Sequence, residues 1–222
     1  MININRFAVV GILFLLTSVI SADVSNLSEK IKDFLTARVD KAIAYLEYVK
    51  LKVDTRKEFT GAEKEEIKSN LNGYINYFKA KKNDIENAKT IQDLKIIVKD
   101  LREKWKEVRA YRKSLNGLIL VSRFREIAVK AKNLSKRIEL KISELNVSKE
   151  NKTKLMELNS KFKVAIELME DKALEAREKF KLKANKAGYS LLREAKSYLR
   201  DAFHVLRDIV REFRELKSKS RK

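Results

Sequence analysis

The fold class follows from residues 192–216, whose sequence is LREAKSYLRDAFHVLRDIVREFREL. Apolar residues recur in this stretch at alternating steps of three and four: Leu192, Ala195, Leu199, Ala202, Leu206, Ile209, Phe213 and Leu216. This spacing places the side chains on one face of an α-helix and is typical of a coiled-coil seam. We therefore expect a long amphipathic helix with a buried seam. Truncating Leu199 or Leu206 to alanine should then cost about 2–5 kcal/mol.

Helix-breaking residues are almost absent from the rest of the chain. The 222 residues include no proline and only five glycines, whereas average usage would give about eleven prolines. Both residues interrupt helices and form turns, so their scarcity predicts a small number of long helices. It also argues against a sheet, whose strands need turns at short intervals.

Start signals locate several helices. Thr60 precedes Glu63 by three residues, which is the spacing of a capping box, and Thr90 and Asp93 repeat the signal more weakly. Residues 146–151 (NVSKEN) form the clearest turn in the second half, with Ser148 as a plausible N-cap. The Asn-Gly pair at 116–117 lies between flanks of helical period, so we expect a local bend in a continuous helix.

These signals predict an all-α fold: an elongated antiparallel helical bundle of coiled-coil hairpins. A short hairpin (26–88) would pack against a long hairpin (91–217), followed by a basic tail (217–222). No linker composition divides residues 23–222, which we expect to form one domain. Gly188 leaves two alternatives open, because it could end one helix or lie inside a single helix of about 65 residues.

The N-terminus has the three-part layout of a secretory signal peptide over residues 1–22. A short polar start with one positive charge precedes an apolar run over residues 7–20, and the chain turns polar at Asp23. A membrane span needs about 20 apolar residues, so this run is short for an anchor. We expect cleavage after Ala22 and export to the extracellular space or cell envelope, with an uncleaved anchor as the alternative.

Residues that carry enzymatic chemistry are scarce. The chain has no cysteine and one histidine, His204. General acid–base and metal sites normally need a second partner at defined spacing. Phosphate-binding loops need clustered glycines, and those of this chain lie far apart. The sequence therefore predicts no catalytic, cofactor or metal site, and we expect a protein that is not an enzyme.

Positive charge dominates the chain and suggests an anionic partner. It has 51 Lys and Arg against 31 Asp and Glu, a formal charge of +20. If the long hairpin turns near Ser148, residues near 180 lie opposite residues near 116, which brings two basic segments together. The candidate polyanion-binding residues are Arg109, Arg112, Lys113, Lys181, Lys183, Lys186, Lys217, Lys219, Arg221 and Lys222. The alternative is a solvated lysine-rich face.

Four Asn-x-Ser/Thr sequons are present, at Asn26, Asn133, Asn146 and Asn151. Asn146 and Asn151 flank the predicted turn and should be exposed. They are the best candidates for glycosylation if the host modifies exported proteins.

Residues 60–113, with the segments TGAEKEEIKSN and TIQDLKIIVKDLREKWKEVRAYRK, resemble uncharacterised exported all-helical proteins of archaea and little-studied bacterial lineages. The shared features are a capped second helix, a Thr-x-x-Asp/Glu-Leu start to the third, and a basic segment around a Trp. The resemblance covers about a quarter of the chain. It implies an exported, archaeal-type helical protein and lends no mechanism or functional residues.

The leading hypothesis from the sequence is a non-enzymatic exported helical scaffold or binding module. It would act at the cell envelope on an anionic polymer or membrane surface, or on a helical protein partner. The alternative is an exported protein that binds nucleic acid or another polyanion. Recognition motifs for nucleic acid are absent, and the aromatic residues follow the core pattern.

Overall fold

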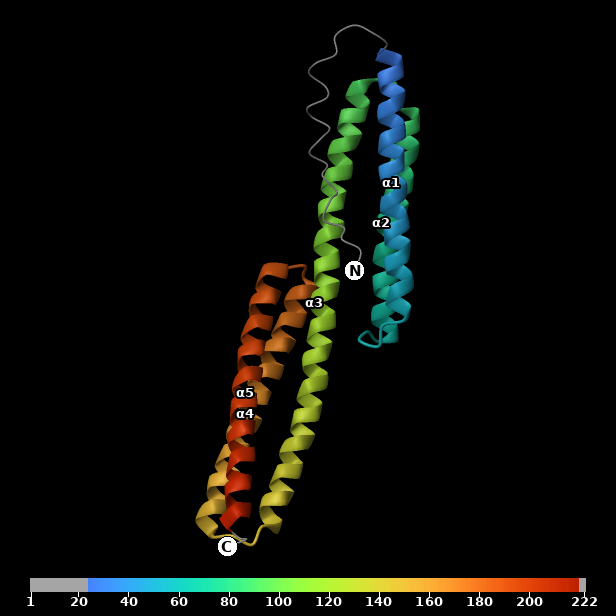
Figure 1. The fold of residues 1–222 in the computed structure, drawn as a ribbon. Helices are drawn as coiled ribbons and strands as arrows, with labels where there is room; N and C mark the ends of the chain where they lie inside the picture. Colours follow the sequence, from blue (N-terminus) through green and yellow to red (C-terminus); the bar gives the residue numbers. More distant parts are fainter. Residues whose placement is uncertain (1–23, 220–222) are drawn as a thin grey trace. The chain divides into compact units, whose positions relative to one another are not determined.

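The computed structural model describes residues 24–219, which fold into five α-helices (Figure 1). These are α1 (Val24–Asp54), α2 (Gly61–Asn87), α3 (Ile91–Glu144), α4 (Lys149–Lys181) and α5 (Asn185–Lys219). The described part of the chain contains no β-strand, which confirms the all-α helical bundle. The expected signal peptide, with its cut after Ala22, lies outside the described residues.

The chain groups into two compact units, and α3 contributes to both. The first unit takes residues up to Lys52 and from Ile67 to Glu103, and the second takes Val53–Glu66 and the residues from Lys104 onward. This division differs from the expected hairpins 26–88 and 91–217, because the first part of α3 packs with α1 and α2.

The first unit packs α1, α2 and the start of α3 around an aliphatic core. Leu46, Leu71, Ile75, Ile85 and Leu94 are among its fully buried side chains. Salt bridges join the helices at the surface, since Lys82 Nζ lies 2.9 Å from Asp40 on α1 and Lys81 Nζ lies 2.9 Å from Asp100 on α3.

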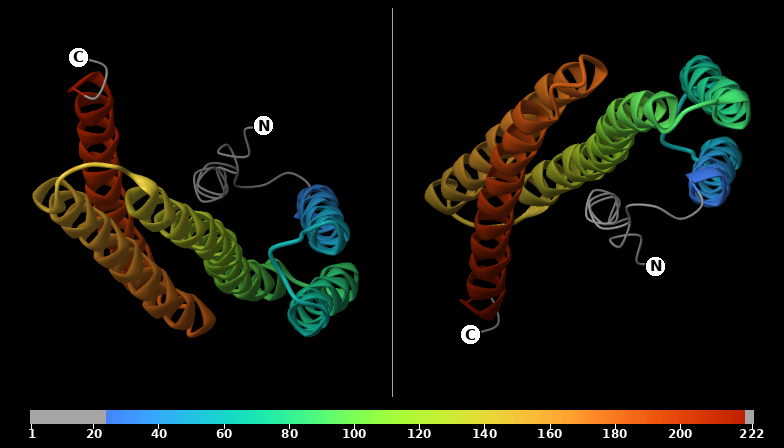
Figure 2. Two further views of the ribbon diagram at one scale, coloured as in Figure 1. Left: turned by 90° about the horizontal axis from the view of Figure 1, so that it is seen from below. Right: turned by 90° about the horizontal axis from the view of Figure 1, so that it is seen from above.

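The second unit packs the remainder of α3 with α4 and α5. Figure 2 shows α3 and α4 running alongside each other and α5 crossing them at an angle. Its core draws on all three helices through Val121, Ala128, Ile142, Leu155, Ile166, Met169, Ala195 and Ile209. One polar pair lies in this core, where Ser135 Oγ donates to Asn159 Oδ1 at 3.1 Å.

The predicted helix starts are confirmed by hydrogen bonds. Glu63 N–H donates to Thr60 Oγ1 at 3.3 Å, and Thr60 N–H donates to Glu63 Oε2 at 2.9 Å. Thr90 and Asp93 make the same reciprocal pair at 3.1 and 2.9 Å. Ser148 is the N-cap of α4, and its hydroxyl accepts from the N–H of Asn151. Asn116 and Gly117 lie inside a continuous α3.

The chain reverses between α4 and α5 at residues 182–184. Ala184 N–H donates to Lys179 O at 2.9 Å and Lys183 N–H donates to Phe180 O at 3.0 Å. These two bonds form a Schellman motif, which ends α4. Residues 149–217 are therefore two helices, and Gly188 lies in the first turn of α5 rather than at the break.

The expectation of a fully buried seam is wrong for three of its eight positions. Leu192, Ala195, Ala202, Ile209 and Leu216 are buried, whereas Leu199, Leu206 and Phe213 are only half-buried. Leu199, Leu206 and Phe213 are seven residues apart, so they share the edge of the seam that lies away from the ion pairs between α4 and α5. No helix of the described chain has a stretch that is both long and apolar enough to span a bilayer.

Candidate anion-binding groove

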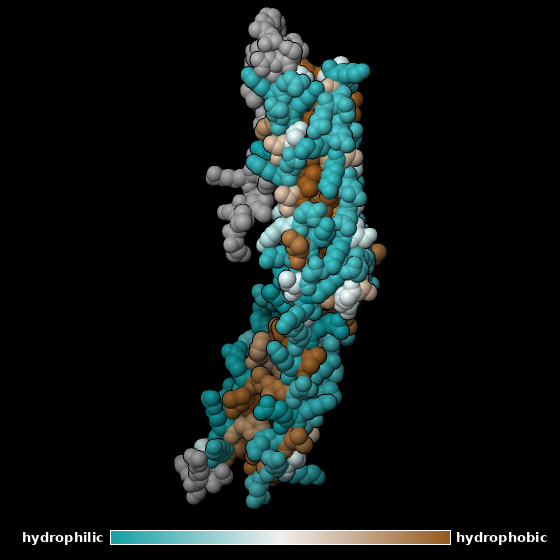
Figure 3. Space-filling view, turned by 90° about the vertical axis from the view of Figure 1, so that its right-hand side faces the viewer, coloured by the Kyte–Doolittle hydropathy of each residue, from teal (hydrophilic) through white to brown (hydrophobic). Residues whose placement is uncertain are grey.

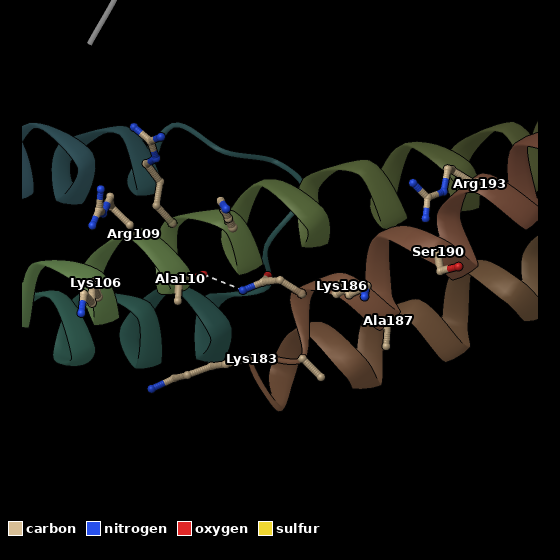
Figure 4. Close-up of a pocket in the computed structure, with 12 residues that line it drawn as sticks. Lys106, Arg109, Ala110, Lys183, Lys186, Ala187, Ser190 and Arg193 are labelled. Carbon is tan, nitrogen blue, oxygen red and sulfur yellow. Dashed lines mark hydrogen bonds between the residues drawn. The ribbon is translucent and has the colours of Figure 1, made fainter. Parts of the chain in front are cut away.

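A groove of about 1000 Å³ lies in the second unit, where α5 begins beside α3 (Figure 4). Seven of its lining residues are basic: Lys106, Arg109, Arg112, Lys113, Lys183, Lys186 and Arg193. Ala110, Ala184, Asn185, Ala187 and Ser190 complete the lining. None of the lining residues is acidic, so the groove concentrates positive charge on one concave surface.

Asn185 ties the two walls of the groove together. Its Nδ2 donates to the Ala110 carbonyl at 2.9 Å (Figure 4). Its Oδ1 accepts from the Ser114 hydroxyl at 3.1 Å. One turn along α5, the Tyr189 hydroxyl donates to the Lys113 carbonyl at 3.0 Å. Burial raises the pKa of Tyr189, so this hydroxyl stays protonated and remains a donor. These bonds fix the start of α5 against α3.

Lys183 is held in the left-handed backbone conformation, with φ of 57°. It occupies the position of the Schellman motif that glycine normally fills, and a side chain in this conformation costs about 1–2 kcal/mol. The Lys183 ammonium lies 5.8 Å from the centre of the Tyr111 ring, which is a cation–π distance. Glycine would fit this turn with less backbone strain. The lysine at this position adds a cation to the groove at a cost in backbone energy.

The basic side chains of the groove are exposed. No salt bridge to a described residue is formed by Lys106, Arg109, Lys113, Lys186 or Arg193. The first turn of α5 also lines the groove, and a helix N-terminus carries a partial positive charge. Backbone and side chains thus contribute charge of the same sign, which suits a ligand with several negative groups.

The groove gathers five of the ten candidate residues that the charge pattern predicted. Arg109, Arg112, Lys113, Lys183 and Lys186 line it together. The predicted register explains this, because α4 and α3 are antiparallel and the ring of Phe180 meets Gly117.

The remaining candidates lie elsewhere. Lys181 is the last residue of α4, and its Nζ lies 3.1 Å from Glu178 Oε1. Lys217 is exposed near the end of α5, and Lys219 is the last residue of that helix. Arg221 and Lys222 lie outside the described residues.

Lys106 and Arg193 belong to the groove but were not among the sequence candidates. A signal for Arg193 exists in the sequence, where Arg193, Arg200, Arg207 and Arg214 recur every seven residues. Residues spaced by seven share a helical face, so these arginines form one row along α5. Lys106 lacks such a signal, because it stands among alternating charges on α3.

The glycosylation candidates and the single histidine lie outside the groove. Asn146 is exposed in the connection between α3 and α4, whereas Asn151 is half-buried in the first turn of α4. His204 is exposed on α5, where its ring contacts the Arg207 guanidinium. Among the described residues, no three acidic or histidine side chains cluster in a way that could hold a metal ion.

Searches of protein-family models, curated proteins and solved structures found no match to this chain.

Proposed function

We propose that this protein is a non-enzymatic, exported helical binding module that holds an anionic polymer of the cell envelope in the basic groove. The groove itself carries the proposal, because exposed cations from α3 and α5 converge there without a lining carboxylate. A ligand with repeated phosphate, sulfate or carboxylate groups would neutralise several of them at once. The strained Lys183 supports the same function, since the turn keeps a cation at a cost in stability.

The nucleic-acid alternative has less support from the groove. Single-stranded nucleic acids are usually held by aromatic rings on which bases stack. No aromatic side chain is among the lining residues, and Tyr111, whose ring lies at a cation–π distance from Lys183, is buried. Contact with the backbone of a duplex needs no such ring, so duplex DNA serves as one arm of the test.

The test compares binding of residues 23–222 to three probes: a sulfated polysaccharide, a DNA duplex and vesicles containing anionic phospholipid. The groove variant carries Arg109→Gln, Lys113→Gln and Lys186→Gln, which remove three exposed cations that form no salt bridge to a described residue. At about 1 kcal/mol per basic residue, its affinity for the preferred probe should fall by about 100-fold. The probe bound most tightly identifies the class of anion.

A matched control removes the same charge elsewhere. Lys50→Gln, Lys172→Gln and Arg211→Gln delete cations that are already paired, with Glu47 at 2.6 Å, Glu175 at 2.9 Å and Asp208 at 2.8 Å. We expect this variant to bind within threefold of the unmodified protein, or roughly 0.6 kcal/mol. Equal losses in both variants would mean that net charge alone drives binding. An absence of binding to all three probes would refute the proposed function.

Export is tested separately, by the intact mass of the protein recovered from its host. We propose removal of residues 1–22, so the recovered chain should begin at or within a few residues of Asp23. Retention of Met1 would support the uncleaved anchor instead.

A further inference from the structure

A strip of apolar side chains remains open to solvent along α3 and α5 in the second unit, away from the basic groove. Phe203 and Val210 on α5 are 55% and 41% exposed. Toward the end of the strip, a hollow of about 380 Å³ is lined by Leu134 and Ile138 of α3 and Phe213 of α5. Figure 3 shows this strip of apolar surface between hydrophilic margins.

The apolar face of α5 extends beyond the surface that packs against the other helices of the second unit. The ion pairs Lys154–Glu212 and Lys172–Glu194 mark the side of α5 that faces α4. By helical spacing, Phe203 and Val210 lie on the opposite side, next to the half-buried Leu206. An apolar stripe that extends past the seam on one side is typical of a helix with a further neighbour in a bundle.

Rows of cations border the strip on both helices. On α3 they are Arg123, Lys130 and Arg137, and on α5 they are Arg200, Arg207 and Arg214. Within each row the residues are seven apart, or about 10 Å along the helix axis. All six are exposed, and none forms a salt bridge to a described residue. Glu144 is the acidic residue lining the hollow, and it is already paired with Lys141 at 2.9 Å.

We propose that this strip is a docking site for an acidic amphipathic helix of a partner protein, which would lie between α3 and α5 as an additional helix of the second unit. Charges beside a helical seam determine which helices pair. Rows of one sign on both margins favour a helix with carboxylates on both of its edges. From Arg123 to Lys141 the strip accepts a helix of about 20 residues, or about 30 Å.

Charge and shape disfavour two other occupants. A second copy of this chain would bring one set of basic rows against another. A flat bilayer fits poorly, because Leu134, Ile138 and Phe213 line a hollow between two helices. Both alternatives become outcomes of the test.

The test uses the chain from residue 23 and two designed 21-residue helical peptides. Both have leucine at the seam positions, and one carries glutamate and the other lysine on the flanks. We expect the acidic peptide to bind at least tenfold more tightly, by about 1.4 kcal/mol. The charge-reversed variant Arg207→Glu with Arg214→Glu should reverse the preference, so that the lysine-flanked peptide binds more tightly. Loss of folding would weaken both peptides and could not produce that reversal.

A second pair of variants tests the apolar contact. Phe203→Ser with Val210→Ser should weaken acidic-peptide binding at least tenfold. The control, Val164→Ser with Leu168→Ser, alters side chains on α4 that are 50% and 40% exposed and should leave binding unchanged. Three results would overturn the proposal: equal binding of both peptides, self-association that Phe203→Ser abolishes, or a preference for anionic vesicles over the acidic peptide that the Phe203 variant removes. Because the basic groove is unaltered in these variants, failure here is distinguishable from failure of the proposed function.

Discussion

The ring of Phe180 fills the space where Gly117 has no side chain. A Cβ built on Gly117 would lie 2.3 Å from Cζ of Phe180, and one built on Gly188 would lie 2.7 Å from its Cε1. The ring therefore sits between two glycines, one on α3 and one on α5, and is 1% exposed. It cannot move away from one glycine without meeting the other, so this contact fixes where the three helices meet.

Gly117→Ala should destabilise the protein even though alanine favours helices. Overpacking a filled site costs about 1–3 kcal/mol, which exceeds the gain of about 1 kcal/mol from helix propensity. Gly73→Ala is the control, because no atom lies within 4 Å of its added Cβ. It should stabilise by up to about 1 kcal/mol. Chemical denaturation of both variants checks the opposite signs, and stabilisation by Gly117→Ala would contradict the packing.

Glu63 should make stability depend on pH. Burial by itself raises the pKa of its carboxyl, but hydrogen bonds from Thr60 and the charge of Arg177 outweigh that effect and leave the pKa below its ordinary value of 4.5. A lowered folded-state pKa means that the carboxylate stabilises the fold above the ordinary value. This contribution is lost as the pH falls through the lower folded-state value.

Glu63→Gln isolates this effect, because glutamine is also accepted in a capping box. The unmodified protein should be more stable than the variant at pH 7, and the difference should shrink as the pH falls from about 5 to about 3. Denaturant titrations at several pH values measure it. A stability difference that is constant over this pH range would show that ionisation of the Glu63 carboxylate is not linked to folding.

Lys183→Gly should separate stability from binding. Glycine relieves the left-handed backbone and should stabilise the fold by up to about 1 kcal/mol. Lys186→Gly also removes one cation of the groove, but at a helical position, where glycine costs up to about 1 kcal/mol. Both variants should bind the anionic probe more weakly while their unfolding free energies move in opposite directions. Unchanged binding in both would remove Lys183 and Lys186 from the site.

The two edges of the α5 seam should respond unequally to truncation. Ile209 is 1% exposed, so Ile209→Ala should cost about 2–5 kcal/mol. Leu206 is half-buried, so Leu206→Ala should cost less than half of that. This replaces the sequence-based expectation of equal, large costs along the seam. Equal costs in thermal or chemical unfolding would show that α5 packs more symmetrically.

The sequence predicted the helices and their capped starts because these depend on local spacing. Thr60 with Glu63, and Thr90 with Asp93, form hydrogen bonds within one turn, and no tertiary contact is needed to anticipate them. The register of α3 against α4 followed from the turn at Ser148. That register predicted that five of the seven groove cations lie near one another.

The reversal at residues 182–184 could not be predicted, because Leu182, Lys183 and Ala184 are ordinary helix formers. Gly188 was one of two alternatives for the break, but it lies inside α5, seven residues after the end of α4, where it makes room for Phe180. Tertiary packing thus determined both positions. The half-exposed edge of the α5 seam has the same origin, since a heptad pattern does not specify how much of the seam the neighbouring helices cover.

The salt dependence of binding tests the central claim, that the basic groove holds the anion, most directly. With a DNA duplex as probe, each cation that contacts a phosphate contributes about −0.9 to the slope of log affinity against log salt. The variant with Arg109→Gln, Lys113→Gln and Lys186→Gln should therefore have a slope less steep by about 2 to 3 than the unmodified protein. The control with Lys50→Gln, Lys172→Gln and Arg211→Gln should retain the full slope. Identical slopes in all three proteins would contradict the account.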